Sequence, residues 1–164
     1  MNAPSSRRVN DAYYTPRGAV LALKDGLRPL NLDDLLVYEP CAGQLAIARE
    51  FPYVITNDVD PASPAQRHKD ARTDWPGVPD LIDWVVTNPP FNQAIPMLAL
   101  WHSKLKSREI AGIALLLRLT FLEPTQDRGD FLKANPPSSL FVLPRYSFTG
   151  DGKTDSVTCA WMVW

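Results

Sequence analysis

The chain alternates short apolar runs with amphipathic stretches. Runs of apolar and β-branched residues predict strands over 35–39, 53–56, 81–87, 110–119, 139–143 and 156–164. Mixed apolar and polar positions predict helices over 16–26, 45–50 and 93–106, with a shorter one inside 123–133. Residues 61–72 leave room for at most a brief helix and an abbreviated third strand.

This order of elements predicts an α/β fold. Strands that alternate with helices favour a mostly parallel, doubly wound sheet, to which the last hairpin adds a C-terminal antiparallel edge strand. The run over 110–119 is the most apolar of the chain, so we expect it to be a central strand buried on both faces. Residues 1–10 are expected to form a disordered tail, which leaves one domain over 11–164.

The first helix has a recognisable start. Thr15 is a good N-cap residue, and Pro16 suits the first helical position because its fixed φ is helical and its missing N–H needs no partner there. We therefore expect this helix to begin at Pro16.

The composition is that of an ordinary globular protein, with 45% hydrophobic and 21% charged residues. No apolar run reaches the roughly 18 residues of a membrane span, and the polar start differs from a signal peptide, so we expect a cytoplasmic protein. Cys41 and Cys159 are far apart and outside any Cys/His cluster, which favours buried reduced thiols over a disulfide or a metal site.

The net charge of −1 weighs mildly against nucleic-acid binding, which usually needs a basic face. The charges are unevenly distributed along the chain. Basic residues gather up to residue 28 and around 104–108, whereas acidic residues gather over 33–60. These basic clusters could be solvent-exposed helix faces or a surface that binds the phosphates of a nucleic acid.

Four polar residues fall at the ends of predicted strands, namely Glu39, Asp58, Asp74 and Asn88. Ligands of parallel α/β sheets bind beyond the carboxyl ends of the strands, so these side chains are expected to converge on one crevice. The small-residue turn after Glu39 lets a backbone approach a nucleotide-like ligand. It lacks the glycine spacing of a dinucleotide or phosphate loop, which argues against a nicotinamide or ATP cofactor.

The strand over 81–87 ends in Asn88-Pro89-Pro90-Phe91. Two prolines stop the strand and stiffen the turn. The Asn88 amide oxygen and the Pro89 carbonyl can each accept a hydrogen of an exocyclic amine, while Phe91 stacks on the heterocycle that carries it. A turn that only ends a strand could have the same sequence, so the functional interpretation of this motif depends on the rest of the chain.

Together, these motifs resemble the adenine-N6 DNA methyltransferases that use S-adenosylmethionine, over residues 11–164. Asn88 to Phe91 is similar to their catalytic [DN]PP[YFW] motif, Glu39 to Gly43 to their cofactor motif I, and Tyr14 to Pro16 to the motif upstream of it. The resemblance implies a class I Rossmann-like methyltransferase fold, S-adenosylmethionine as cofactor, and DNA as substrate.

The resemblance also implies roles for the matching positions. Tyr14, Thr15 and Pro16 would hold the methionine end of the cofactor, and Glu39, Pro40, Cys41, Ala42 and Gly43 would wrap its methionyl and ribose part. Asp58 and Val59 would bind the ribose, and Asp74 would accept from the adenine amino group, with Trp75 and Pro90 flanking the ring. Asn88, Pro89 and Phe91 would hold the target base.

The chain departs from the family pattern in two places. Leu45 stands where the family often has a second glycine, and no target-recognition domain fits between Asp58 and Asn88 or after the last strand. We therefore expect short or relaxed sequence selection, or help from a second copy or a specificity subunit. Adenine in RNA, a protein glutamine, and a catalytically silent cofactor-binding module are the alternatives.

The loop over 145–155 carries a further hypothesis. Arg145 and Lys153 could meet phosphates, and Phe148 could cover a flipped base. An ordinary hairpin loop with one packed aromatic side chain fits the same residues equally well.

Overall fold

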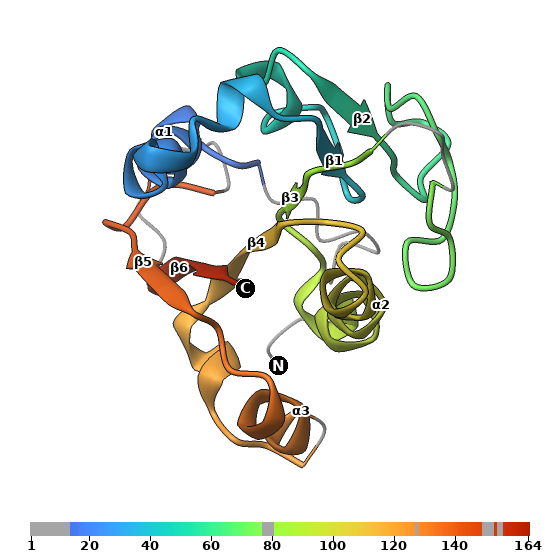
Figure 1. Cartoon of the computed structure of the whole chain (residues 1–164). Helices are drawn as coiled ribbons and strands as arrows, with labels where there is room; N and C mark the ends of the chain where they lie inside the picture. The colour runs from blue at the N-terminus through green and yellow to red at the C-terminus, as the bar shows by residue number, and fades with distance from the viewer. Residues whose placement is uncertain (1–13, 77–80, 127, 149–152, 154–155) are drawn as a thin grey trace, which may run out of the picture.

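The computed structural model describes residues 14–76, 81–126, 128–148, 153 and 156–164, so the tail expected over 1–10 lies outside the described residues. One sheet runs through the molecule in the strand order β2-β1-β3-β4-β6-β5 (Figure 1). Its strands are β1 (Val37–Glu39), β2 (Val54–Thr56), β3 (Trp84–Thr87), β4 (Gly112–Arg118), β5 (Ser139–Val142) and β6 (Cys159–Val163).

The sheet is mostly parallel, as the sequence predicts. β1 pairs in parallel with β2 on one side and β3 on the other, and β3 pairs in parallel with β4. β6 is antiparallel to both β4 and β5, so it lies one position in from the edge, which β5 forms. The strand order reverses at β1 and β3, and crevices open at such a point beyond the carboxyl ends of the strands.

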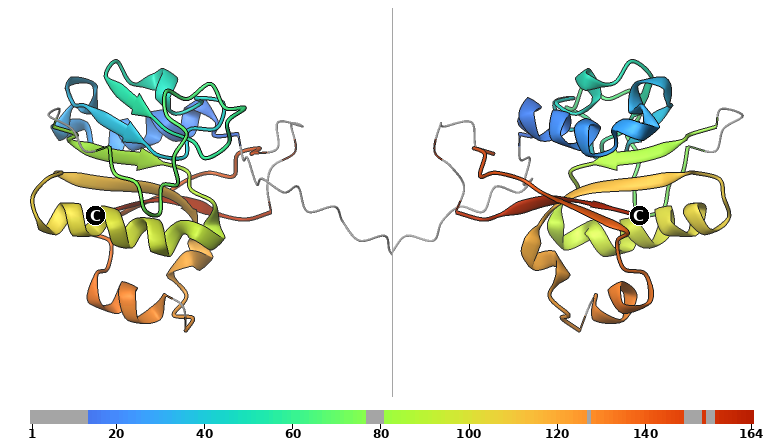
Figure 2. Two further views of the ribbon diagram at one scale, coloured as in Figure 1. Left: turned by 90° about the vertical axis from the view of Figure 1, so that its right-hand side faces the viewer. Right: turned by 60° about the vertical axis from the view of Figure 1, so that its left-hand side comes forward.

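Helices cover both faces of the sheet. The α-helices are α1 (Arg17–Gly26), α2 (Ala94–Lys106) and α3 (Gly129–Ala134). The two side views show α1 on one side of the sheet and α2 and α3 on the other (Figure 2). Short 3₁₀ turns complete the described elements at Arg28–Leu30, Leu32–Asp34, Ala48–Glu50, Phe91–Gln93 and Leu119–Leu122.

The central strand β4 explains how two cores arise from one run of apolar residues. Successive side chains of a strand point to opposite faces. Accordingly, Ala114 and Leu116 pack in the core under α1, whereas Ile113, Leu115 and Leu117 pack in the core under α2. The predicted burial of this strand on both faces is confirmed.

Gly112 opens β4 at a point of close contact. A Cβ atom built there would lie 2.3 Å from the indole atom Cζ2 of Trp84, which belongs to the neighbouring strand β3. Only glycine therefore allows the buried Trp84 ring to lie against the start of β4.

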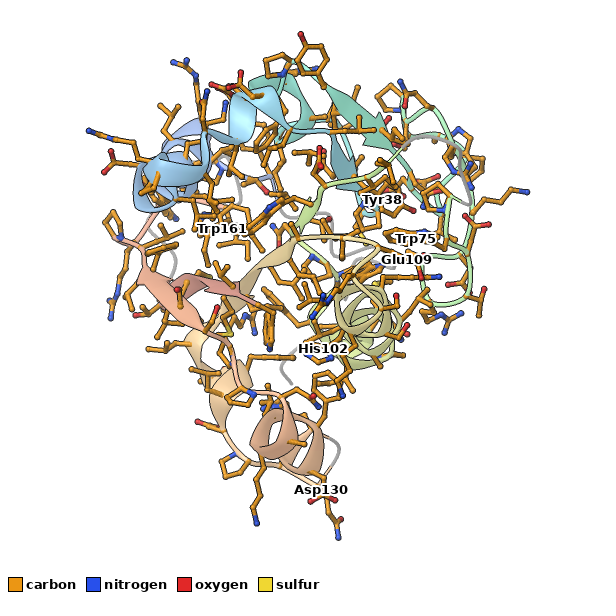
Figure 3. All side chains as sticks on the ribbon, in the orientation of Figure 1. Tyr38, Trp75, His102, Glu109, Asp130 and Trp161 are labelled. Carbon is orange, nitrogen blue, oxygen red and sulfur yellow. The ribbon has the colours of Figure 1, made fainter. Side chains whose placement is uncertain are left out.

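Trp161 ties α1 to the C-terminal half of the sheet. Its indole Nε1 donates to the carbonyl oxygen of Ala19 at 2.7 Å, and the ring is fully buried. Figure 3 shows the labelled Trp161 side chain reaching from β6 into the layer that α1 covers. This contact supports the segment before α1, which borders the candidate site.

Two local predictions are wrong. The helix expected over 45–50 is a series of turns ending in the 3₁₀ turn at Ala48–Glu50, because Leu45 takes a left-handed φ of 65°. The first α-helix begins at Arg17, with Pro16 in the N-cap position, and Thr15 makes no capping bond. Residues 61–72, which left room for at most a brief helix and an abbreviated strand, form turns and one bridge between Asn57 and Arg67.

No helix among the described residues is both long and apolar enough to cross a membrane.

Candidate functional site

A cavity of about 730 Å³ lies beyond the carboxyl ends of β1, β2 and β3. Most of its wall comes from the segments that follow these strands, and the rest from the segment before α1 and from α2. The residues that line it are Tyr14, Thr15, Glu39, Pro40, Cys41, Ala42, Gly43, Gln44, Ala46, Ile47, Asp58, Val59, Asp60, Ser63, Lys69, Asp70, Ala71, Arg72, Asn88, Pro90, Asn92, Gln93 and Met97. Its volume is within the range of small-molecule sites.

The turn after β1 gives a ligand access to backbone atoms. Gly43 has a left-handed φ of 49°, and a Cβ atom built on it would meet no atom within 4 Å. Asp58 holds this turn in place, because its Oδ2 accepts from the Gly43 N–H at 2.7 Å and its Oδ1 from the Asp60 N–H at 2.9 Å. The Asp58 carboxylate thus fixes one wall of the cavity.

Asn57 also holds this wall of the cavity in place. The sequence analysis did not identify this residue. Its fully buried side chain donates to the carbonyl oxygens of Pro40 at 3.0 Å and Lys69 at 2.9 Å. Its Oδ1 accepts from the Lys69 N–H at 2.9 Å. A signal was present, since a buried strand that ends in asparagine needs partners for that amide.

Glu39 places a buried carboxyl group in the cavity wall. Its side chain is 1% exposed, and Oε2 has no hydrogen-bond partner among the described residues. Burial raises the pKa of this carboxyl group well above its usual value, and the Asp58 charge acts in the same direction, against a hydrogen bond from the Ala48 backbone. A buried oxygen without a partner, in the wall of a cavity, suits a ligand that donates to it.

The Asn88 turn also contributes to the cavity wall, through Asn88 and Pro90. The Asn88 Nδ2 donates to the Thr15 hydroxyl oxygen at 3.1 Å, which leaves its amide oxygen for another partner. The Pro90 carbonyl accepts from the Gln93 N–H, whereas no hydrogen bond reaches the Pro89 carbonyl from the described residues. Neither the Asn88 amide oxygen nor the Pro89 carbonyl thus accepts a hydrogen bond from the described residues, and of the two residues only Asn88 lines the cavity, since Pro89 is buried.

Several solved structures with the same architecture are titled as methyltransferases. A candidate RNA methyltransferase from Pyrococcus horikoshii matches at a TM-score of 0.63 and 15% identity, covering 92% of this chain and 85% of that one. A precorrin-6y C5,15-methyltransferase from Geobacter metallireducens matches at a TM-score of 0.61 and 13% identity, covering 96% and 92%. The chain has the Rossmann-like methyltransferase fold.

A third structure with the methyltransferase fold is a dimethyladenosine transferase from Plasmodium falciparum. It matches at a TM-score of 0.56 and 15% identity and covers 92% of this chain, which spans 61% of that longer protein. No family model and no curated protein sequence matches the chain. The comparisons therefore establish the fold alone.

Within this methyltransferase fold, most of the residues expected to bind the cofactor line one cavity. These are Tyr14, Thr15, Glu39, Pro40, Cys41, Ala42, Gly43, Asp58, Val59 and Asn88, with Pro90 beside them. The expected convergence therefore brings together Glu39, Asp58 and Asn88 from three strand ends. Pro16, Pro89 and Phe91 stand outside the lining.

Asp74 and Trp75 also lie outside the cavity. Arg67 pairs with Asp74 through Nη2 at 2.7 Å, and the Trp75 ring stands edge-on to Tyr38 at 5.6 Å between centroids. Figure 3 shows Tyr38 and Trp75 pointing toward each other. Arg67 binds one oxygen of the Asp74 carboxylate, and Asp74 stands outside the residues that line the cavity, so its expected role as adenine acceptor stays a prediction.

Asp70, Ala71 and Arg72 occupy the wall where Asp74 and Trp75 were expected, and sequence reasoning missed them. Hydrogen bonds from the Arg72 side chain and backbone lower the pKa of Asp70 to about 2. Arg72 also donates to the Gln93 side chain at 3.3 Å. It thereby links the turns after β2 to the start of α2 at the cavity rim.

The loop hypothesis needs a correction. Phe148 is 5% exposed and packs in the core under α1, so it cannot cover a base in this structure. Arg145 and Lys153 are exposed, and the remainder of the loop falls partly outside the described residues. No group of three or more His, Cys, Asp or Glu among the described residues could hold a metal ion, and both cysteines are free.

Proposed function

We propose that the chain is an S-adenosylmethionine-dependent methyltransferase that methylates the exocyclic N6 amine of adenine in DNA. The observation that carries this proposal is the Asn88 amide, which Thr15 holds at the cavity rim with its oxygen available. A planar amine is the group that such an oxygen and the neighbouring Pro89 carbonyl can grip.

Three features of the cavity support S-adenosylmethionine as the cofactor. The open space beside Gly43 admits a ligand close to the backbone, and the unpartnered Oε2 of Glu39 can accept from a cationic or hydroxyl-bearing ligand. Asp58 shapes the turn between them. S-adenosylmethionine, when bound, would supply an electrophilic methyl group on a sulfonium centre.

The chain's own residues would stabilise the reacting amine. The lone pair of the adenine amine is delocalised into the ring, so the nitrogen must become pyramidal to react. Two fixed acceptors, the Asn88 Oδ1 and the Pro89 carbonyl, would favour that geometry as positive charge develops on the nitrogen. No general base is needed beforehand, because the nitrogen becomes acidic only on methylation and can then lose its proton to water.

A base inside a duplex cannot reach the cavity rim, so adenine would have to be flipped out of the stack. Stacking on Phe91 would offset part of that cost. Phe91 belongs to the same turn as Asn88, which would keep the ring and the amide in fixed relation.

Adenine in RNA is the second candidate substrate. Two of the solved structures with this fold are titled as an RNA methyltransferase and a dimethyladenosine transferase, and the Asn88 turn would hold adenine equally well in either polymer. Sequence selection by a second copy or a specificity subunit would fit both substrates.

Transfer of labelled methyl from S-adenosylmethionine tests the proposal. Unmethylated DNA, RNA and a protein extract serve as acceptors in parallel, with calorimetric cofactor binding as the control. We expect N6-methyladenine in DNA, and loss of transfer in Asn88→Ala while the cofactor still binds. Label in RNA or in protein glutamine would contradict the DNA assignment. Cofactor binding without transfer to any acceptor would favour a silent binding module.

A further inference from the structure

Arg118, the last residue of β4, stands over the ring of Phe91. Its guanidinium carbon lies 4.8 Å from the ring centroid, and both side chains are half-buried. β3 and β4 are parallel neighbours, so the turn that leaves β3 and the end of β4 meet at the same edge of the sheet. Arg118 therefore belongs to the side of Asn88 where a target base is expected.

The guanidinium and a nucleobase compete for the same surface. Both are planar and lie on aromatic faces at similar spacing. Phe91 also packs against the core under α2, which leaves limited ring surface for a base. A base that stacks on the face covered by Arg118 has to displace the guanidinium.

We propose that Arg118 is a nucleic-acid-binding residue that covers Phe91 in the substrate-free protein and moves onto a backbone phosphate when the target base stacks there. This inference rests on the proposed function. Arginine suits both positions, because its planar fork stacks on rings and binds phosphate oxygens in pairs.

A second arginine on an aromatic ring shows what a structural role looks like here. Arg128 lies 5.3 Å from the centroid of Phe121, which is 4% exposed. Its side chain donates to the backbone carbonyl oxygens of Thr120 and Glu123. Arg128 therefore provides a matched control for a guanidinium on a ring.

The test compares Arg118→Met, Arg118→Lys and Arg128→Lys in the full chain. The probe is an adenine-containing single-stranded oligonucleotide, with affinity measured by fluorescence anisotropy over a range of salt. Arg118→Met keeps an apolar stem on Phe91 and removes the charge. We expect it to weaken binding about tenfold and to lower the salt slope by about one ion, with unchanged cofactor affinity. Arg118→Lys should restore the slope.

Unchanged oligonucleotide affinity and salt slope in a folded Arg118→Met protein would overturn the inference, as would an equal loss in Arg128→Lys. A parent protein that binds cofactor but neither binds nor methylates the oligonucleotide would instead contradict the proposed function. Melting temperatures of the three variants distinguish a loss of binding from a loss of folding.

Discussion

Asn88 donates a hydrogen bond from its side-chain Nδ2 to the Thr15 hydroxyl oxygen at 3.1 Å, across 73 positions of sequence. Thr15 is 3% exposed and lies directly before the N-cap of α1. The contact therefore joins the start of the first helix to the turn after β3, and it sets which end of the Asn88 amide remains available.

Replacing Thr15 with valine should impair catalysis more than it impairs folding. Valine keeps the shape and removes the acceptor, so the Asn88 amide loses the bond that orients it. A hydrogen bond of this kind contributes about 1 kcal/mol, which predicts a loss of about five- to tenfold in kcat. Steady-state kinetics on the methyl acceptor measure it.

Thr15→Ser provides the matched control, because serine retains the hydroxyl group and should keep most of the parent kcat. If serine lowered kcat and valine did not, methyl packing rather than the hydrogen bond would account for the role of Thr15.

The carboxyl group of Glu39 should make stability depend on pH. Burial raises its pKa above the usual 4.5 in the folded chain. Above the unfolded pKa, the folded protein therefore keeps a proton that the unfolded chain releases. Raising the pH then favours unfolding, by at most about 1.4 kcal/mol per pH unit, until the folded pKa is passed.

Urea denaturation of the ligand-free protein from about pH 5 to about pH 8 measures this effect, with Glu39→Gln as the comparison. Glutamine does not titrate, so its advantage over glutamate should grow as the pH rises. A constant difference between the two proteins across this range would show that Glu39 ionises normally.

Leu45 provides a test of backbone strain in the turn after β1. A non-glycine residue in the left-handed region costs about 1–2 kcal/mol, and Leu45 has a φ of 65°. Leu45→Gly and Leu45→Ala both remove the side chain beyond Cβ, but only glycine removes the strain. We expect the glycine variant to be more stable than the alanine variant by about 1 kcal/mol, measured by urea denaturation. The reverse order would contradict the strain.

Gly112→Ala should be strongly destabilising. The added Cβ atom would lie within 2.5 Å of three ring atoms of Trp84, which is 4% exposed and cannot move freely. Overpacking of this kind costs about 1–3 kcal/mol, so thermal unfolding should shift down by several degrees. Combining it with Trp84→Phe, which shortens the ring, should recover part of the loss. A lack of recovery would point to backbone strain.

The strands, α1 and α2 were predictable because each has a clear apolar pattern and a stop signal. The helix over 45–50 was not, since one left-handed residue, Leu45, overrides a helical pattern that local propensity supports. The positions of Asp74 outside the cavity lining and of Phe148 in the core were unpredictable for another reason. Whether a carboxylate pairs with Arg67, or a loop phenylalanine turns into the core, depends on contacts with residues elsewhere in the fold.

The turns that replace a helix after β1 change what the cavity can select. A helix of several turns would point the positive end of its dipole at the ligand, which is how many α/β proteins hold phosphates. Here that segment is held by Asp58 and Asn57 instead. The lining carries the carboxylates of Asp58, Asp60 and Asp70 against the cations of Lys69 and Arg72, and it also carries Glu39, whose raised pKa favours its neutral form. We therefore expect this wall to disfavour nucleoside phosphates and to favour the nucleoside joined to a cation that the proposed cofactor presents.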